Sequence, residues 1–261
     1  MKHRISFVGA GNVAWHMAQA FKTAGCEVAQ IWSRRIENAS LLAEKIGAEA
    51  INDIRQLRTN DVDAVFIAVA DGAIETLAQQ INAHETILIH TAGSVDISVL
   101  AHGAQRYGAA WPVQSLVKGT NTNMHEVPFC IEGCDNMTTE TIRNILRQVS
   151  PKIYEMDGLQ RRKAHLAACM VSNFGNALNA LSQEMMEKNG IDFALLRPLI
   201  ELTARKAEAD NIWQQQTGAA TRHDQSTIAA HRALIGDNDE VRQLYDIMTR
   251  IIEKHCADNA H

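Results

Sequence analysis

The chain has 261 residues, of which 46% are hydrophobic, 21% are charged and only 5% are aromatic. This apolar fraction is ordinary for a globular protein and excludes disorder as the main state, and the length suits two domains at a typical size of about 150 residues. The formal net charge is −5, and no stretch carries a dense run of lysine and arginine, which argues against nucleic-acid binding.

Membrane and metal-binding classes are disfavoured as well. The β-rich apolar stretch at residues 64–70 is far shorter than the roughly 20 residues that cross a bilayer. The N-terminus runs through charged residues directly into a strand-like segment, unlike a signal peptide. The five cysteines show no paired spacing, so we expect free thiols, no metal site and a cytoplasmic protein.

The first 155 residues alternate short β-like runs with amphipathic helical stretches. Strands are predicted at residues 5–8, 28–32, 64–69, 87–89, 108–111, 129–131 and 153–154, and helices from the first strand to residue 21 and at 38–46. The continuous apolar run at 64–69 is typical of a strand buried on both faces of a parallel sheet. Strands that alternate with helices predict βαβ units, and hence an α/β fold with a doubly wound, mainly parallel sheet.

Beyond Gly158 only helical patterns remain, so we place a domain boundary between residues 155 and 156. One long helix is predicted at residues 161–188, with Gly190 as its left-handed cap. Asp192 is expected to cap a helix that runs to about residue 209. Two more helices are predicted at 226–235 and 238–256, the last opened by a capping box of Asp237 and Glu240.

A glycine-rich turn directly follows the first strand and opens the first helix. Its residues are Gly9, Ala10, Gly11, Asn12, Val13 and Ala14, which fit the pattern G-x-G-x-x-A. The first glycine permits a tight turn, the second lets a pyrophosphate approach the backbone, and the small last residue lets helix and strand pack closely. The helix N-terminus offers N–H groups to the phosphates. We therefore predict a Rossmann domain whose dinucleotide contacts residues 9–13, with a purely structural turn as the alternative.

The end of the second strand indicates which dinucleotide is bound. A site that prefers NAD would place Asp or Glu there to bind the ribose hydroxyl. The sequence instead reads Ser33-Arg34-Arg35, and a hydroxyl with two guanidinium groups can bind a 2′-phosphate. NADP is therefore favoured over NAD, and solvated surface arginines are the alternative.

Two further strand ends should face the cofactor, because ligands in such sheets bind beyond the carboxyl ends of the strands. The residues expected at the cofactor are Val69, Ala70, Asp71, Thr91, Ala92 and Gly93, with Ser94 at the substrate. His90 ends the second of these strands. It is either an acid in the reaction or a structural histidine bonded to the backbone.

The long predicted helix has a polar face without charge. At about 100° per residue, His165, Ser172 and Asn176 share this face and Asn173 flanks it. Met170, Phe174, Leu181 and Met185 gather on the opposite face, which we expect to belong to the core. Uncharged polar groups suit a cleft, so His165 is the candidate proton donor, and Asn173 and Asn176 are candidate substrate contacts. A polar seam between domains or subunits is the alternative.

Two further expectations concern the C-terminal half. Arg222 could clamp a carboxylate or phosphate of the substrate, or it could pair with Asp224. The apolar face of the long helix, together with Ile247 and Ile251 of the last one, exceeds what one small helical domain can bury. We therefore expect a homodimer formed through the helical domain.

The N-terminal half resembles the Rossmann domain of pyrroline-5-carboxylate reductase and of the deazaflavin-dependent NADP oxidoreductases. The whole chain is similar to bacterial two-domain NADP oxidoreductases whose helical half is a domain of unknown function. The resemblance rests on residues 9–14, 68–74, 90–94, 111–116, 164–168, 172–173 and 217–231. Trp111, Ala219 and His223 stand where the family pattern has His, Pro and Gly. Cys169 stands where the distant β-hydroxyacid dehydrogenases carry lysine, so no lysine acid can be transferred.

These features together predict an NADP-dependent oxidoreductase of the 6-phosphogluconate-dehydrogenase-like type. Residues 1–155 would form the NAD(P)-binding Rossmann domain and residues 156–261 the helical substrate and dimerisation domain. A hydride would pass between the nicotinamide and a small carbonyl or imine, with His165 or His90 as acid and Asn173 orienting the substrate. The alternatives are a non-catalytic NADP-binding sensor or regulatory module, and a dimerising scaffold whose glycine turn binds nothing.

Overall fold

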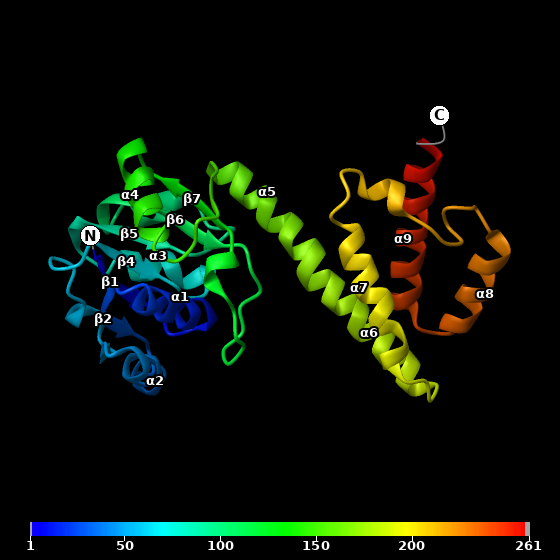
Figure 1. Ribbon diagram of the computed structural model, residues 1–261, viewed down its shortest axis with the longest axis horizontal. Coiled ribbons are helices and arrows are strands. Elements are labelled where there is room, and N and C mark those ends of the chain that lie inside the picture. Colours follow the sequence, from blue (N-terminus) through cyan, green and yellow to red (C-terminus); the bar gives the residue numbers. More distant parts are fainter. Residues whose placement is uncertain (1, 259–261) are drawn as a thin grey trace. The chain divides into compact units, whose positions relative to one another are not determined.

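The structure is a computed structural model that describes residues 2–258 (Figure 1). The chain divides into two compact units, the first ending at Leu178 and the second beginning at Asn179. The helix α6 (Gly175–Lys188) contributes residues to both units.

The first unit is built on an eight-stranded sheet with the order β3-β2-β1-β4-β5-β6-β7-β8. The strands are β1 (Arg4–Val8), β2 (Glu27–Trp32), β3 (Glu49–Ile51), β4 (Ala64–Ile67), β5 (Ala83–His90), β6 (Ala104–Pro112), β7 (Phe129–Gly133) and β8 (Ile153–Glu155). All neighbours pair in parallel except β6 and β7. The chain moves outward in one direction from β1 to β3 and in the other from β4, so the doubly wound, mainly parallel Rossmann sheet is confirmed.

Helices cover both faces of this sheet (Figure 1). One face packs against α1 (Asn12–Thr23), α2 (Ile36–Ile46) and α4 (Asn136–Leu146), and the other against α3 (Ile74–Ala78). In β1, Phe7 points to the first face and Val8 to the second, and both are fully buried. Because successive side chains of a strand point to opposite faces, a strand covered on both sides reads as a continuous apolar run.

Three short or partly polar elements were not predicted from the sequence: β3, α3 and α4. The strand β3 has three residues and α3 has five, which is too short for a hydrophobic periodicity to be recognised in the sequence. In α4 the buried stripe consists of Thr138 and Thr139 beside Ile142, Ile145 and Leu146, so the helix has few strongly apolar residues. Asp135 caps this helix by accepting a hydrogen bond from the N–H of Thr138.

The predicted helix at 161–188 consists of α5 (Gly158–Cys169), a π-helical turn (Met170–Phe174) and α6. A π turn holds more residues than an α turn, so a uniform 100° spacing does not apply beyond residue 169. Met170, Phe174, Leu181 and Met185, which that spacing assigned to the core, are between 37% and 58% exposed. The expectation that they form the core is therefore wrong for the described chain.

The second unit contains the rest of α6 with α7 (Arg197–Lys206), α8 (Gln225–Ile235) and α9 (Asp239–Asp258). Gly190 adopts a left-handed φ of 68°, and Asp192 accepts a hydrogen bond from Ala194 N–H at the start of a 3₁₀ turn that leads into α7. Asn238 caps α9 by accepting from Val241 N–H, so the predicted capping box of Asp237 and Glu240 is wrong. Of the helices described, none is long and apolar enough to cross a membrane.

Candidate active site

The turn between β1 and α1 has two glycines with different constraints. Gly9 adopts a φ of +122°, and a Cβ there would lie 2.2 Å from the carbonyl oxygen of Ala68, so the position requires glycine. A Cβ on Gly11 would meet only that same oxygen, at 3.9 Å, which leaves open space on its other sides. Within the described chain, no side chain caps α1 at Gly11. The first N–H groups of α1 therefore remain available to a ligand.

A cavity of about 1060 Å³ lies in front of this turn, at the carboxyl ends of β1, β2, β4 and β5. The predicted cofactor residues that line it are Gly9, Ala10, Gly11, Asn12, Val13, Ser33, Arg34, Val69, Ala70, Asp71, Thr91 and Ala92. Ligands of doubly wound sheets bind where the strand order reverses, which here is between β1 and β4. The open space at Gly11 and the helix N-terminus fit a pyrophosphate.

Polar and basic groups line the β2 end of this cavity. Ser33, Arg34 and Asn38 contribute to the lining, whereas Arg35, the residue that precedes α2, does not. The one carboxylate in the described lining, Asp71, comes from the loop after β4. The side chains after β2 therefore offer hydrogen-bond donors and one guanidinium, a set that fits a phosphate ester.

A buried guanidinium holds the loop that follows β5. Arg161 of α5 is fully buried, and its Nη1 donates to the carbonyl oxygens of Ala92, Gly93 and Val95 at 3.1, 3.2 and 2.7 Å. Its Nη2 donates to the carboxylate of Glu132 on β7 at 2.8 Å. Sequence reasoning missed this residue, because an arginine in the first turn of an amphipathic helix has no local feature that distinguishes it from a solvated one.

One turn beyond Arg161, the ring of His165 packs against the same loop. A Cβ on Gly93 would lie 2.5 Å from Cδ2 of His165 and 2.9 Å from Cδ2 of Trp111, so this position also requires glycine. The rings of Trp111 and His165 meet edge to face, with centroids 5.3 Å apart. Trp111 is buried and His165 is half-buried. The structure therefore places the side chain of His165, from α5, against the loop after β5, whose residues Thr91 and Ala92 line the cavity.

His90 is fully buried at the end of β5. Its Nδ1 accepts a hydrogen bond from the N–H of Ala92 at 3.2 Å, and among the described residues its Nε2 has no partner. Burial, with the nearby charge of Arg161 as the second cause, lowers the pKa of His90 to about 3. The ring is therefore neutral near pH 7. This favours the structural, backbone-bonded role over the acid.

The remaining candidate residues have other surroundings. Ser94 Oγ donates to the carboxylate of Asp71 and so links the loops after β4 and β5. The side-chain oxygen of Asn12 accepts from Lys118 N–H at 3.1 Å. Asn173, in the π turn, and Asn176, in α6, are exposed, and within the described chain no hydrogen bond joins either of them to His165.

Arg222 is exposed in the loop before α8, in the second unit. Asp224, two residues on, caps α8 through Thr227 N–H. Hydrogen bonds from Ser226 and Thr227 hold the pKa of Asp224 well below its usual range, and the charge of Arg222 is the smallest contribution. The main role of Asp224 is therefore that of a helix cap.

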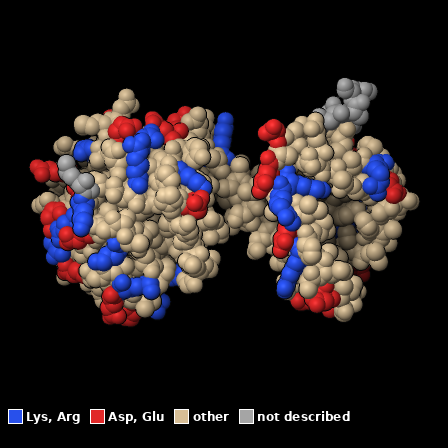
Figure 2. Space-filling view, viewed as in Figure 1, with Lys and Arg blue, Asp and Glu red and all other residues tan. Residues whose placement is uncertain are grey.

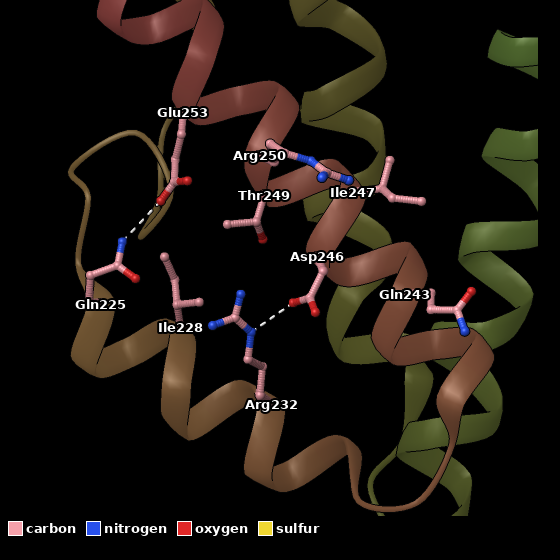
Figure 3. A pocket seen from close by; sticks show the side chains of 9 residues that line it. All are labelled: Gln225, Ile228, Arg232, Gln243, Asp246, Ile247, Thr249, Arg250 and Glu253. Atoms are coloured by element: carbon pink, nitrogen blue, oxygen red, sulfur yellow. Dashed lines mark hydrogen bonds and ion pairs between the residues drawn. The ribbon is translucent and has the colours of Figure 1, made fainter.

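A second cavity, of about 590 Å³, lies between α8 and α9 and contains none of the predicted site residues (Figure 3). Two polar contacts cross it: Arg232 Nε donates to Asp246 at 2.7 Å, and Gln225 Nε2 donates to Glu253 at 3.1 Å. These contacts tie α8 to α9 and engage both carboxylates of the cavity.

On the face shown in Figure 2, acidic and basic side chains are interspersed over both units.

Comparison with known proteins assigns a family to each half of the chain. Residues 4–94 match the family described as NADP oxidoreductase, coenzyme F420-dependent, and residues 127–252 match the Domain of unknown function (DUF2520). A Bacteroides fragilis protein provisionally assigned as an NADP oxidoreductase is 31% identical over 97% of this chain and 98% of that chain, with a TM-score of 0.89. A comparison with curated proteins found no match.

Two more distant structures share the fold. A pyrroline-5-carboxylate reductase from Coxiella burnetii is 17% identical over 99% of this chain and 98% of that chain, with a TM-score of 0.61. A reductive aminase from Aspergillus terreus, in complex with NADPH and ethyl levulinate, is 17% identical over 99% of this chain and 95% of that chain, with a TM-score of 0.67.

The two glycines of the turn should respond differently to alanine. Gly9→Ala forces a Cβ into Ala68 at a positive φ, so the free energy of unfolding should fall by about 1–3 kcal/mol or more. Gly11→Ala should cost less than about 1 kcal/mol, yet weaken binding of a pyridine dinucleotide, because its Cβ would enter the space open to a pyrophosphate. Denaturant unfolding and NADPH titration of both variants measure this. Wild-type stability in Gly9→Ala would contradict the close approach.

Proposed function

The chain belongs to the family of two-domain NADP oxidoreductases that join a coenzyme F420-dependent type of oxidoreductase domain to DUF2520, and we propose that it is an NADPH-dependent reductase of a small carbonyl or imine compound. The observation that carries the proposal is the packing of His165 on the loop after β5, whose residues Thr91 and Ala92 line the cavity. The dinucleotide, when bound, supplies the hydride. His165 would supply the proton that the carbonyl oxygen or imine nitrogen needs.

The chain's own residues divide the remaining tasks in this proposal. The N–H groups at the start of α1 would bind the pyrophosphate, and Arg34 with Ser33 would bind the 2′-phosphate. Asn173 would orient the substrate, with Asn176 and Arg222 as further contacts. His90, neutral and buried, would hold the loop through Ala92 and leave the acid role to His165.

Replacing His165 tests the chemistry. His165→Ala should lower the turnover rate in NADPH oxidation by roughly 10²–10⁴-fold, the usual contribution of a general acid, while NADPH affinity changes little. A panel of oxo acids, aldehydes and imines supplies the substrates. His84→Ala is the matched control, because His84 is exposed near the amino end of the same strand, β5. Unchanged turnover in His165→Ala would refute the acid role, and NADPH binding without turnover on any compound would favour the sensor.

The cofactor preference can be tested at two adjacent arginines. At 100 times its dissociation constant, a ligand stabilises the fold by about 2.7 kcal/mol, so NADPH should raise the melting temperature more than NADH at equal concentration. Arg34→Ala should remove most of this difference and Arg35→Ala less, because only Arg34 lines the cavity. Equal melting shifts from both cofactors in the unmodified protein would contradict an NADP preference.

We also propose that the protein is a homodimer formed through its helical half. Leu166, Met170, Val171 and Phe174 lie within nine residues of one helix and are between 57% and 81% exposed. Such a run of large apolar side chains on one element usually marks an interface. The twofold symmetry of most homo-oligomers would bring two copies of this helix to one interface.

Sedimentation at micromolar concentration should therefore give the mass of a dimer. Val171→Asp should shift the equilibrium toward the monomer, because it places a charge in the buried interface. Met137→Asp is the control, since Met137 is 66% exposed on α4, outside the helical half. A monomer in the unmodified protein would overturn the proposal.

A further inference from the structure

We propose that the backbone N–H groups of Gly93 and Ser94 form a binding site for a carboxylate of the substrate, beside His165. The inference deepens the proposed reductase function and rests on it for the identity of the ligand as substrate. The sequence predicted that this loop contacts mainly the cofactor. The inference adds that the loop binds the substrate, and that the substrate is a small oxo or imino acid.

The direction of these N–H groups follows from the contacts of Arg161. The carbonyl oxygens of Ala92 and Gly93 both accept hydrogen bonds from its Nη1, at 3.1 and 3.2 Å. All peptide bonds of the described chain are trans, and in a trans peptide the N–H points opposite to the C=O. The N–H groups of Gly93 and Ser94 belong to these same two peptides. They therefore both point away from the guanidinium.

Neither of the two N–H groups has a hydrogen-bond acceptor among the residues that the structure describes; Gly93 is buried, whereas Ser94 is exposed. The preceding donors are satisfied, since Thr91 N–H bonds to the carbonyl oxygen of Ile67 and Ala92 N–H to His90. More than nine in ten buried backbone N–H groups in proteins are paired. The open donor of buried Gly93, with a second open donor beside it on the same side of the loop, therefore points to a ligand that accepts hydrogen bonds.

The chemistry of the surroundings selects an anionic oxygen. Successive backbone N–H groups with a common direction bind anions, as in oxyanion holes. A cation is disfavoured here, because the carbonyl oxygens of these peptides point toward the positive charge of Arg161. The hydroxyl of Ser94 is bonded to Asp71, which leaves the backbone as the donor at this residue. A carboxylate held here would lie beside Gly93, against which the ring of His165 packs.

Arg161 is the positioning residue of this site and does not itself touch the ligand. Its planar fork reaches three carbonyl oxygens and Glu132 at once, which the single ammonium group of lysine cannot reproduce. If the fork is lost, the two peptides are free to rotate and the N–H groups no longer share one direction.

Amide resonances of the ¹⁵N-labelled protein test the site directly. After saturation with NADP⁺, pyruvate is added as the carboxylate probe, and the amides of Gly93 and Ser94 should shift with its concentration. The compound 2′,5′-ADP, which lacks the nicotinamide, should leave these amides unmoved. If NADP⁺ alone shifts them and pyruvate adds nothing, the donors serve the carboxamide of the cofactor and the proposal is overturned. Absence of any response to pyruvate overturns it as well.

Two pairs of variants distinguish the contribution of the backbone N–H groups to pyruvate binding from that of the side chains. Ser94→Pro removes the N–H and Ser94→Ala only the hydroxyl, so the proline variant should bind pyruvate about tenfold or more weakly than the alanine variant. Arg161→Lys should weaken pyruvate binding similarly, and Arg162→Lys, at an exposed arginine bonded to Asp96, should not. Equal pyruvate affinity within either pair contradicts the proposal.

The melting shift with 2′,5′-ADP reports separately on folding and on the adenine end of the cofactor cavity. If 2′,5′-ADP does not raise the melting temperature of the unmodified protein, the proposed NADP-dependent function is contradicted. In that case the response of the Gly93 and Ser94 amides to pyruvate is measured without nucleotide, and it still decides whether the carboxylate site exists. The two proposals can therefore fail independently.

Discussion

The guanidinium of Arg161 connects α5, the loop after β5 and β7, and the candidate site depends on this connection. A fully buried charge is costly unless it is paired and hydrogen-bonded, and here one carboxylate and three carbonyl oxygens accept from Nη1 and Nη2, while Nε has no partner among the described residues. The loop is therefore fixed with its carbonyl groups toward the helix. Because His165 follows one turn later on α5, the same contacts also set where its ring meets Gly93.

Two glycines, Gly9 and Gly93, allow close approaches that also hold the candidate site in place. Gly9 lies against the carbonyl oxygen of Ala68, which brings the start of α1 up to the end of β4, and Gly93 lies against His165 and Trp111. Neither position tolerates a Cβ. Gly9 and Thr91 line the cavity, so the placement of this part of its backbone is set by packing inside the first unit. Backbone held by packing in this way has less conformational entropy to lose when a ligand binds.

The parts that sequence reasoning could predict are those with a local signal. The doubly buried strands β1 and β4 appear as apolar runs, and the glycine turn is a contiguous motif. Arg161 could not be predicted, because its partners lie 29 to 69 residues away in the sequence. The residues of the long helix beyond residue 169 were assigned to the wrong face for another reason. The π turn changes the angle between successive residues, and no residue type in the sequence indicates a π turn.

The helix that carries His165 also carries the exposed apolar side chains, and this joins the candidate site to the proposed assembly. Leu166 is the next residue and is 61% exposed, whereas His165 faces the loop after β5. A second copy that covers Leu166 and Val171 would bind only the folded helix, and binding to one state stabilises it by mass action. The π turn and the last turns of α5 would then be ordered from both sides, by the loop and by the partner. Association of two chains would in this way hold the imidazole of His165 in place without any contact to it.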